Sequence, residues 1–143
     1  MNNTKNYLLT DFTTERWKNI NMENVKSQIE KLNEKINKFD CLYGQIGNPY
    51  DKIGNTYGQD ASLISLSKAS HSIKNLTFND GKVYGDVEFL NNDNGKQADN
   101  FINNLNFKFG IRCICISEQY NNGELIIESI ITWDIGYSSW LYF

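Results

Sequence analysis

The chain has 143 residues, of which 40% are hydrophobic and 13% aromatic, so it is long and apolar enough for one folded domain with its own core. Its formal net charge of -3 argues against general binding to nucleic acid or to an acidic membrane surface. The N-terminal stretch is polar and lacks a long apolar run, so we expect neither a signal peptide nor a membrane span, and we predict an intracellular protein.

Three cysteines and one histidine limit the metal and redox chemistry that is open to this chain. Cys113 and Cys115 lie two residues apart on one face of a predicted strand, a placement unsuited to a disulfide between them. With Cys41, they are expected as reduced thiols in a reducing compartment. There is neither C-x-x-C spacing nor a histidine cluster, so we predict no metal site and no cofactor.

The first third of the chain contains one clear helix. Residues 1–20 are weakly patterned and indicate either an arm or an edge strand around Tyr7. Residues 22–39 then predict a helix, with Asn21 as its N-cap. Its apolar stripe is explained more simply by packing on the protein's own sheet than by a coiled coil. The stripe consists of Val25, Ile29, Leu32, Ile36 and Phe39.

The next segments are a short strand and a long loop. Residues 41–46 predict a strand leaving the helix. Residues 47–58 are rich in Gly and Asn and contain Pro49, the only proline, and loops of this length inside compact domains are often functional. Residues 61–66 are read either as a strand or as a helical turn.

Residues 70–116 predict the order strand, tight turn, strand, helix, strand. The turn is at 79–82, where Asp80-Gly81 tolerates the positive φ of a two-residue hairpin loop. Residues 83–90 alternate in the manner of a half-buried strand. A short helix is expected to open at Gly95, because Phe101, Ile102 and Leu105 recur at helical spacing. A strand over about 107–119 follows.

A second hairpin turn is predicted at 121–123, followed by an Ile-rich strand from Glu124 to Asp134 and an aromatic tail over 137–143. The whole pattern predicts a single α+β domain over residues 1–143, with one long and one short helix. Its sheet is mainly antiparallel, either open or closed into a barrel.

The order of these elements, with several of their residues, resembles the prohead (capsid maturation) proteases of tailed phages, which share their fold with the herpesvirus assemblin serine proteases. The similarity extends over about residues 22–136 and depends on the order and spacing of six short motifs. These are residues 43–49 (YGQIGNP), 70–76 (SHSIKNL), 81–87 (GKVYGDV), 94–96 (NGK), 109–113 (FGIRC) and 131–135 (ITWDI).

The resemblance implies a protease fold whose catalytic pair has been replaced. The family's catalytic histidine, just before a proline, corresponds to Asn48, and its nucleophilic serine corresponds to Arg112. An amide does not take a proton from a hydroxyl at neutral pH, and a guanidinium is neither nucleophile nor base. Loss of either group removes most of the activity of such an enzyme. The resemblance therefore implies a non-catalytic protein that acts by binding in capsid assembly or maturation.

Other interpretations remain beside this one. A relocated site pairing Cys113 with His71 is the enzymatic alternative, and we expect His71 to be a structural strand residue instead. Ser70, Ser72 and Ser117 lack an identifiable base. A phage protein that binds and antagonises a host defence is a third alternative.

Among the acidic residues, Asp86, Glu88 and Asp134 are expected on a solvated sheet face. Arg112 stands in an apolar strand, and we expect it to pair internally with Asp51 or another acid; the alternative is that it binds a partner's carboxylate or phosphate.

The expected partner is a protein, such as a capsid or scaffold protein, the active protease or a second copy, in the host cytoplasm or in the virion. Nucleic acid and membrane are not expected as partners. Aromatic residues are typical interface anchors. The candidate binding residues are Arg112, Asn48, Tyr50, Trp133, Tyr137 and Trp140.

Overall fold

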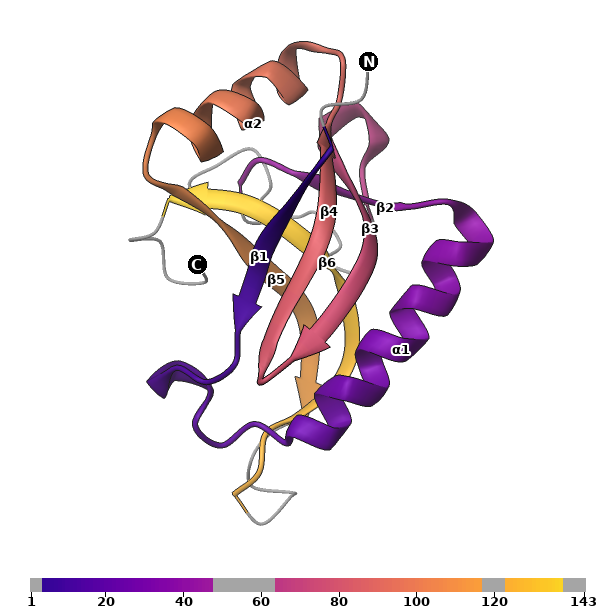
Figure 1. Ribbon diagram of the computed structural model, residues 1–143, viewed down its shortest axis with the longest axis vertical. Helices are drawn as coiled ribbons and strands as arrows, with labels where there is room; N and C mark the ends of the chain where they lie inside the picture. The colour runs from indigo at the N-terminus through magenta and orange to yellow at the C-terminus, as the bar shows by residue number, and fades with distance from the viewer. Residues whose placement is uncertain (1–3, 48–63, 117–122, 138–143) are drawn as a thin grey trace.

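The computed structural model describes residues 4–47, 64–116 and 123–137. Within these ranges the chain forms two α-helices, two short 3-10 turns and six strands (Figure 1). The elements are β1 (Lys5–Asp11), a 3-10 turn (Glu15–Trp17), α1 (Met22–Phe39), β2 (Leu42–Gln45), a 3-10 turn (Leu66–Lys68), β3 (Ala69–Asn79), β4 (Lys82–Phe89), α2 (Asp93–Asn104), β5 (Phe107–Ile116) and β6 (Ile126–Tyr137).

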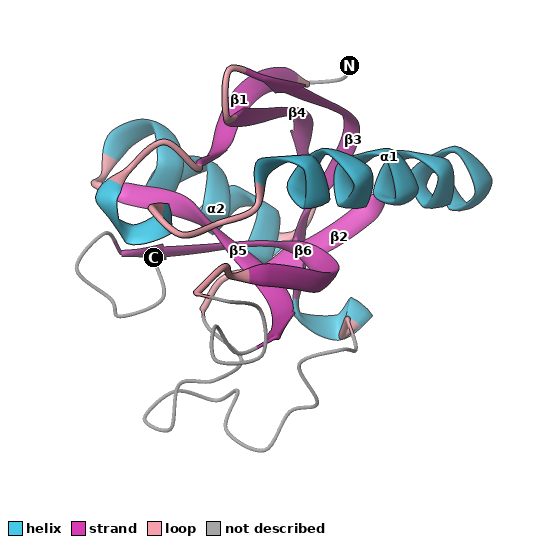
Figure 2. Ribbon diagram, turned by 90° about the horizontal axis from the view of Figure 1, so that it is seen from below, coloured by secondary structure: helices cyan, strands magenta, loops and turns pink. Residues whose placement is uncertain are grey.

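The strands form two antiparallel sheets, which confirms the α+β class. One sheet has the order β1-β4-β3-β2, and the other is the β5–β6 hairpin. Figure 2 shows β1, β4 and β3 on one side of the molecule, the β5–β6 hairpin on the other and α1 alongside both. The alternative of a closed barrel is wrong for the described residues. β2 and β6 share only one parallel bridge, between Ile46 and Ile135, because β2 ends at Gln45 and Gly47 turns the chain at a φ of 99°.

The β3–β4 hairpin has the predicted tight turn. Asp80 and Gly81 have φ values of 51° and 79°, the left-handed conformation that both central residues of a type I′ turn require. In β4 the residues Val83, Gly85 and Val87 are buried, as the alternation predicts. The order strand, turn, strand, helix, strand is therefore confirmed for residues 69–116.

Helix α1 spans the predicted residues 22–39, and the Asn21 side chain accepts a hydrogen bond from the backbone N–H of Asn24 at 2.8 Å. Four members of its apolar stripe are buried, but Phe39 is 62% exposed, so the prediction is wrong for this residue. The physical reason is position. Phe39 is the last helical residue, and the chain turns away at Asp40, which has a φ of 78°.

Two asparagines attach α1 to the two sheets. The Asn33 amide bonds both the N–H and the carbonyl oxygen of Leu76 in β3, at 3.0 and 2.8 Å. The Asn24 amide does the same to Ile127 in β6, at 2.8 and 3.0 Å. Each amide takes the place of a neighbouring strand's peptide group, and the helix thereby satisfies backbone groups at both sheets.

Helix α2 begins at Asp93, two residues before the predicted start. The Asn92 side chain accepts a hydrogen bond from the N–H of Gly95 at 2.7 Å, which places the N-cap at residue 92. Leu105, which recurs at helical spacing in the sequence, is the C-cap residue; it has an extended backbone and is 51% exposed.

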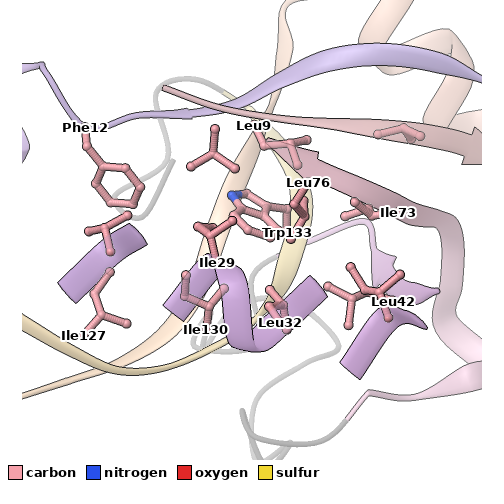
Figure 3. Packing of buried hydrophobic residues seen from close by; sticks show 14 of the residues in the cluster. Leu9, Phe12, Ile29, Leu32, Leu42, Ile73, Leu76, Ile127, Ile130 and Trp133 are labelled. Atoms are coloured by element: carbon pink, nitrogen blue, oxygen red, sulfur yellow. The ribbon is translucent and has the colours of Figure 1, made fainter. Parts of the chain in front are cut away.

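The core lies between the sheets and is closed along one side by α1. Figure 3 shows Trp133 of β6 near its centre, with Leu9 of β1 and Ile29 of α1 beside it. Since β1 pairs with β4 and its residue Leu9 is buried, residues 5–11 form an edge strand rather than an arm.

The close approach of β2, β3 and β6 requires a glycine at position 44. A Cβ atom there would overlap the carbonyl oxygen of Trp133 and Nε2 of His71. We therefore expect Gly44→Ala to lower the free energy of unfolding by at least about 3 kcal/mol, measured by urea denaturation. Gly123→Ala is the control. It meets no atom within 4 Å and has only its φ of 88° as a penalty, which amounts to about 1 kcal/mol. Equal losses in the two variants would contradict the proposed close packing.

Candidate functional site

The position that the resemblance assigns to the nucleophile holds a buried ion pair. Arg112 of β5 is 2% exposed, and Asp134 of β6 is likewise buried. The Arg112 Nε donates to Asp134 Oδ2 at 2.8 Å and Nη2 donates to Oδ1 at 2.7 Å, a bidentate arrangement. The backbone N–H of Gln45 in β2 also donates to Asp134 Oδ1, at 3.1 Å.

This geometry is that of a structural clamp. The pKa of the Asp134 carboxyl is raised above its ordinary value of 3.8 because burial disfavours the charge, while the hydrogen bonds and charge of Arg112 oppose that rise. The expected internal pairing of Arg112 is thus confirmed, with Asp134 as a partner, whereas Asp51 lies outside the described residues. The expectation of a solvated Asp134 is wrong, because its side chain lies where β2, β5 and β6 meet.

His71, the only histidine of the chain, is fully buried in β3. Its Nε2 lies 2.8 Å from the carbonyl oxygen of Trp133, so Nε2 carries the proton and donates it. Its Nδ1 then accepts from the hydroxyl of Ser70 at 2.8 Å. Burial lowers the pKa of the imidazole to about 4, so the ring is neutral at physiological pH.

Ser70 was judged to lack a base, and the structure corrects this, since His71 Nδ1 accepts its proton. Sequence patterning missed the pair because adjacent strand residues ordinarily point to opposite faces. A hydroxyl bonded to an imidazole is also the beginning of a nucleophile–base pair. Here both residues are 0% exposed and Gly44 packs directly against the ring, so no substrate atom reaches the hydroxyl. Both ring nitrogens are engaged, and neither is available to Cys113.

The remaining candidate binding residues lie in the interior, at the surface or outside the described residues. Trp133 is completely buried and its Nε1 donates to Thr10 Oγ1 at 2.7 Å, so Trp133, like Arg112, lies in the interior of the described structure. Tyr137 is 40% exposed and remains a candidate surface residue. Asn48, Tyr50 and Trp140 lie outside the described residues, as does the loop over 48–58.

The described part of the chain contains neither a metal-ligand cluster nor a membrane-spanning helix. No three His, Cys, Asp or Glu side chains of residues 4–47, 64–116 and 123–137 come together as a metal-binding group. Neither described helix is long and apolar enough to cross a membrane.

A groove that sequence reasoning did not find lies between β1 and β5. It has a volume of about 460 Å³ and is lined by residues 7–11 of β1, residues 107–111 of β5, the Arg16–Trp17 turn and Ile102 of α2. The sequence pattern did not predict this groove, because it left open whether residues 1–20 form an arm or an edge strand. The structure shows that β1 is the terminal strand of its sheet and that it lines the groove together with β5.

Comparisons with protein-family models, with curated proteins and with solved structures found no match to this chain. The resemblance to the prohead proteases therefore stays a prediction from the sequence motifs. The structure itself contains a buried arginine–aspartate clamp, a buried serine–histidine pair and an open groove.

Removal of one partner of the clamp is expected to be strongly destabilising. Asp134→Ala leaves a guanidinium buried without its carboxylate, which costs about 3–5 kcal/mol of unfolding free energy. The double variant Arg112→Met/Asp134→Leu removes both charges and is expected to recover much of that loss in urea denaturation. Lys18→Ala, which breaks the exposed Lys18–Glu15 pair, is the control and is expected to unfold at the wild-type midpoint. Equal stability of Asp134→Ala and Lys18→Ala would contradict the clamp.

The buried imidazole predicts a loss of stability in mild acid. Its folded pKa of about 4 lies below the ordinary 6.5, so the unfolded state binds the proton first as the pH falls. This group's contribution is present above pH 6.5 and is lost towards pH 4, at up to about 1.4 kcal/mol per pH unit.

The free energy of unfolding is expected to fall less steeply between pH 6.5 and pH 4 in His71→Gln than in the wild type. This variant retains every other titrating group. An NMR titration of the wild-type imidazole provides an independent readout. A ring that becomes charged near pH 6.5 in the folded protein would refute the assignment.

Proposed function

We propose that this chain is a catalytically inactive, prohead protease-like protein that acts by binding another protein. The observation that carries the proposal is the Arg112–Asp134 clamp. At the position matched to the family's nucleophile there is a guanidinium whose Nε and Nη2 both donate to a buried carboxylate. A group locked in this way is suited to holding strands together and unsuited to attacking a carbonyl carbon.

The state of the only imidazole supports the same proposal. A general base must lie within reach of the proton that it abstracts from a bound substrate. His71 is fully buried, donates to the backbone of β6 and accepts from Ser70, so it stabilises the junction of β3 and β6. On this proposal neither Arg112 nor His71 takes part in catalysis, and the chain acts by binding through its surface.

The biological setting follows from the resemblance alone. A protease-like chain without protease chemistry is suited to capsid assembly or maturation, either as a virion component or as a regulator of the active protease. It would then work in the host cytoplasm or in the virion. The exposed Tyr137, at the end of β6, is one surface residue that such a partner would meet.

Cross-linking of the chain, followed by mass spectrometry, tests this proposal. The experiment is done in cells that express the genome in which the chain is encoded. We expect a capsid-assembly protein or an active maturation protease among the specific cross-links. Recovery of a host defence protein instead would reassign the function to antagonism of that defence.

A separate measurement tests inactivity. Purified wild-type chain is expected neither to cleave unfolded casein nor to react with a fluorophosphonate, because Ser70 is inaccessible. Ser70→Ala is the matched control for any label observed. Labelling or casein cleavage that disappears in a folded Ser70→Ala variant would overturn the proposal in favour of a serine hydrolase.

A further inference from the structure

The groove between β1 and β5 has one wall made by the edge of a sheet. β1 is the terminal strand of its sheet and pairs with β4 through residues 5–11. An edge strand presents backbone N–H and carbonyl groups along its second side, and an extended chain is the structure that pairs with them. Residues 7–11 of β1 line the groove, and β5, which lines its other wall, is not hydrogen-bonded to β1.

The side chains of the groove combine apolar surface with positive charge. Leu8 is 46% exposed although it is apolar, and it lines the groove with Trp17, Phe109 and Ile111. Arg16 and Lys108 also line it, and among the described residues neither forms an ion pair with a carboxylate. Arg16 lies over the Trp17 ring, 5.3 Å from its centre.

Asp11 is the acidic side chain among the described residues that line the groove, and it forms no ion pair with Arg16 or Lys108. The Asp11 carboxylate accepts hydrogen bonds from both the backbone N–H and the hydroxyl of Thr13, so it is engaged within its own turn. The groove therefore offers two cations that pair with no carboxylate of the described residues, against the single negative charge of Asp11, although the chain as a whole has a net charge of -3. Charge complementarity favours an acidic occupant.

We propose that this groove binds an extended, acidic segment of a partner protein, which adds to β1 as a further strand. The inference rests on the proposed function, because it takes the ligand to be protein. Main-chain hydrogen bonds to β1 supply affinity, an apolar side chain of the segment covers Leu8, and its carboxylates pair with Arg16 and Lys108. Side chains of the segment alternate, so every second residue faces the groove.

Peptide selection and NMR test the site directly. Random seven-residue peptides displayed on phage are panned against the full chain, and the strongest binders are synthesised. We expect selected peptides to be enriched in Asp and Glu together with Val, Ile or Thr. Added to ¹⁵N-labelled chain, they are expected to shift backbone amides within residues 7–11 and 107–111. Failure to select peptides, or shifts confined to another surface, would overturn the inference.

Matched charge reversals separate the groove from general electrostatics. Arg16→Glu/Lys108→Glu is expected to weaken peptide binding by about tenfold or more, measured by fluorescence anisotropy. Lys31→Glu/Lys35→Glu makes the same change of charge on the exposed side of α1 and is expected to leave the affinity unchanged. Equal effects of the two double variants would contradict binding in the groove.

N-methylated peptides distinguish strand addition from simple groove filling. Methylation of alternate peptide nitrogens removes the donors of only one edge of the bound segment. One methylated series is expected to lose binding by about tenfold or more while the other retains it. Equal behaviour of both series would refute strand pairing.

A second copy of the chain is the competing occupant. Sedimentation of a dimer that Leu8→Lys dissociates would assign the edge of β1 to self-association and overturn the proposal. The proposed function has its own test. If the charge-reversed groove variant still binds the cross-linked partner as tightly as the wild type, the groove inference fails while protein binding stands.

Discussion

The meeting of the two sheets along residues 132–134 of β6 is the constraint on which the rest of this structure depends. A continuous ladder of backbone hydrogen bonds ordinarily joins neighbouring strands, but β2 and β6 share only one bridge. Side chains supply the other connections. Thr132 Oγ1 donates to the carbonyl oxygen of Tyr43, the carbonyl oxygen of Trp133 accepts a hydrogen bond from His71 Nε2, and the Asp134 carboxylate accepts from Arg112 and from the backbone N–H of Gln45. Buried backbone groups are satisfied in this way without a barrel seam.

This junction explains why polar residues that look catalytic in the sequence are structural in the fold. Arg112 and His71 are each engaged through two of their polar atoms, and both are buried. Breaking such a contact leaves a buried polar group or charge without its partner, and this costs more than the intact contact gains. Selection on stability is therefore a sufficient reason for these residues to be where they are.

Side chains do not close the approach of β1 to β5 in the way that they close the approach of β2 to β6. Where β1 and β5 face one another, the described residues leave a groove, an exposed Leu8 and two cations without carboxylate partners. The two sheets therefore meet differently at their two approaches. The approach of β2 to β6 is closed by side chains, whereas that of β1 to β5 leaves the edge of a sheet exposed. An open strand edge is a liability in a soluble protein unless something covers it.

Local signals predicted the elements well and their ends less well. The spacing of Val25, Ile29, Leu32 and Ile36, with Asn21 before them, contains the whole information for a capped amphipathic helix. The same periodicity does not say that Phe39 falls where the chain turns away, since that depends on the φ of the following residue. Asp80-Gly81 was predictable because few residues tolerate a type I′ turn.

The candidate site was less accessible to sequence reasoning. An arginine inside an apolar strand indicates an internal partner, and this much was expected. That the partner is Asp134, that Ser70 reaches the ring of His71, and that Trp133 is interior all depend on contacts between strands distant in the chain. No local pattern contains such contacts.

The amino-acid sequence by itself determined the α+β class, the helix at 22–39, the hairpin at 79–82 and the order of helix and strand along the chain after it. It did so because capping, periodicity and turn chemistry act over a few neighbouring residues. Only the tertiary structure decided that the barrel stays open, that Arg112 and His71 are internal ties, and that β1 borders a groove. These features arise where β1, β2, β5 and β6 approach one another, and their geometry is set by packing between segments separated by up to about the length of the chain.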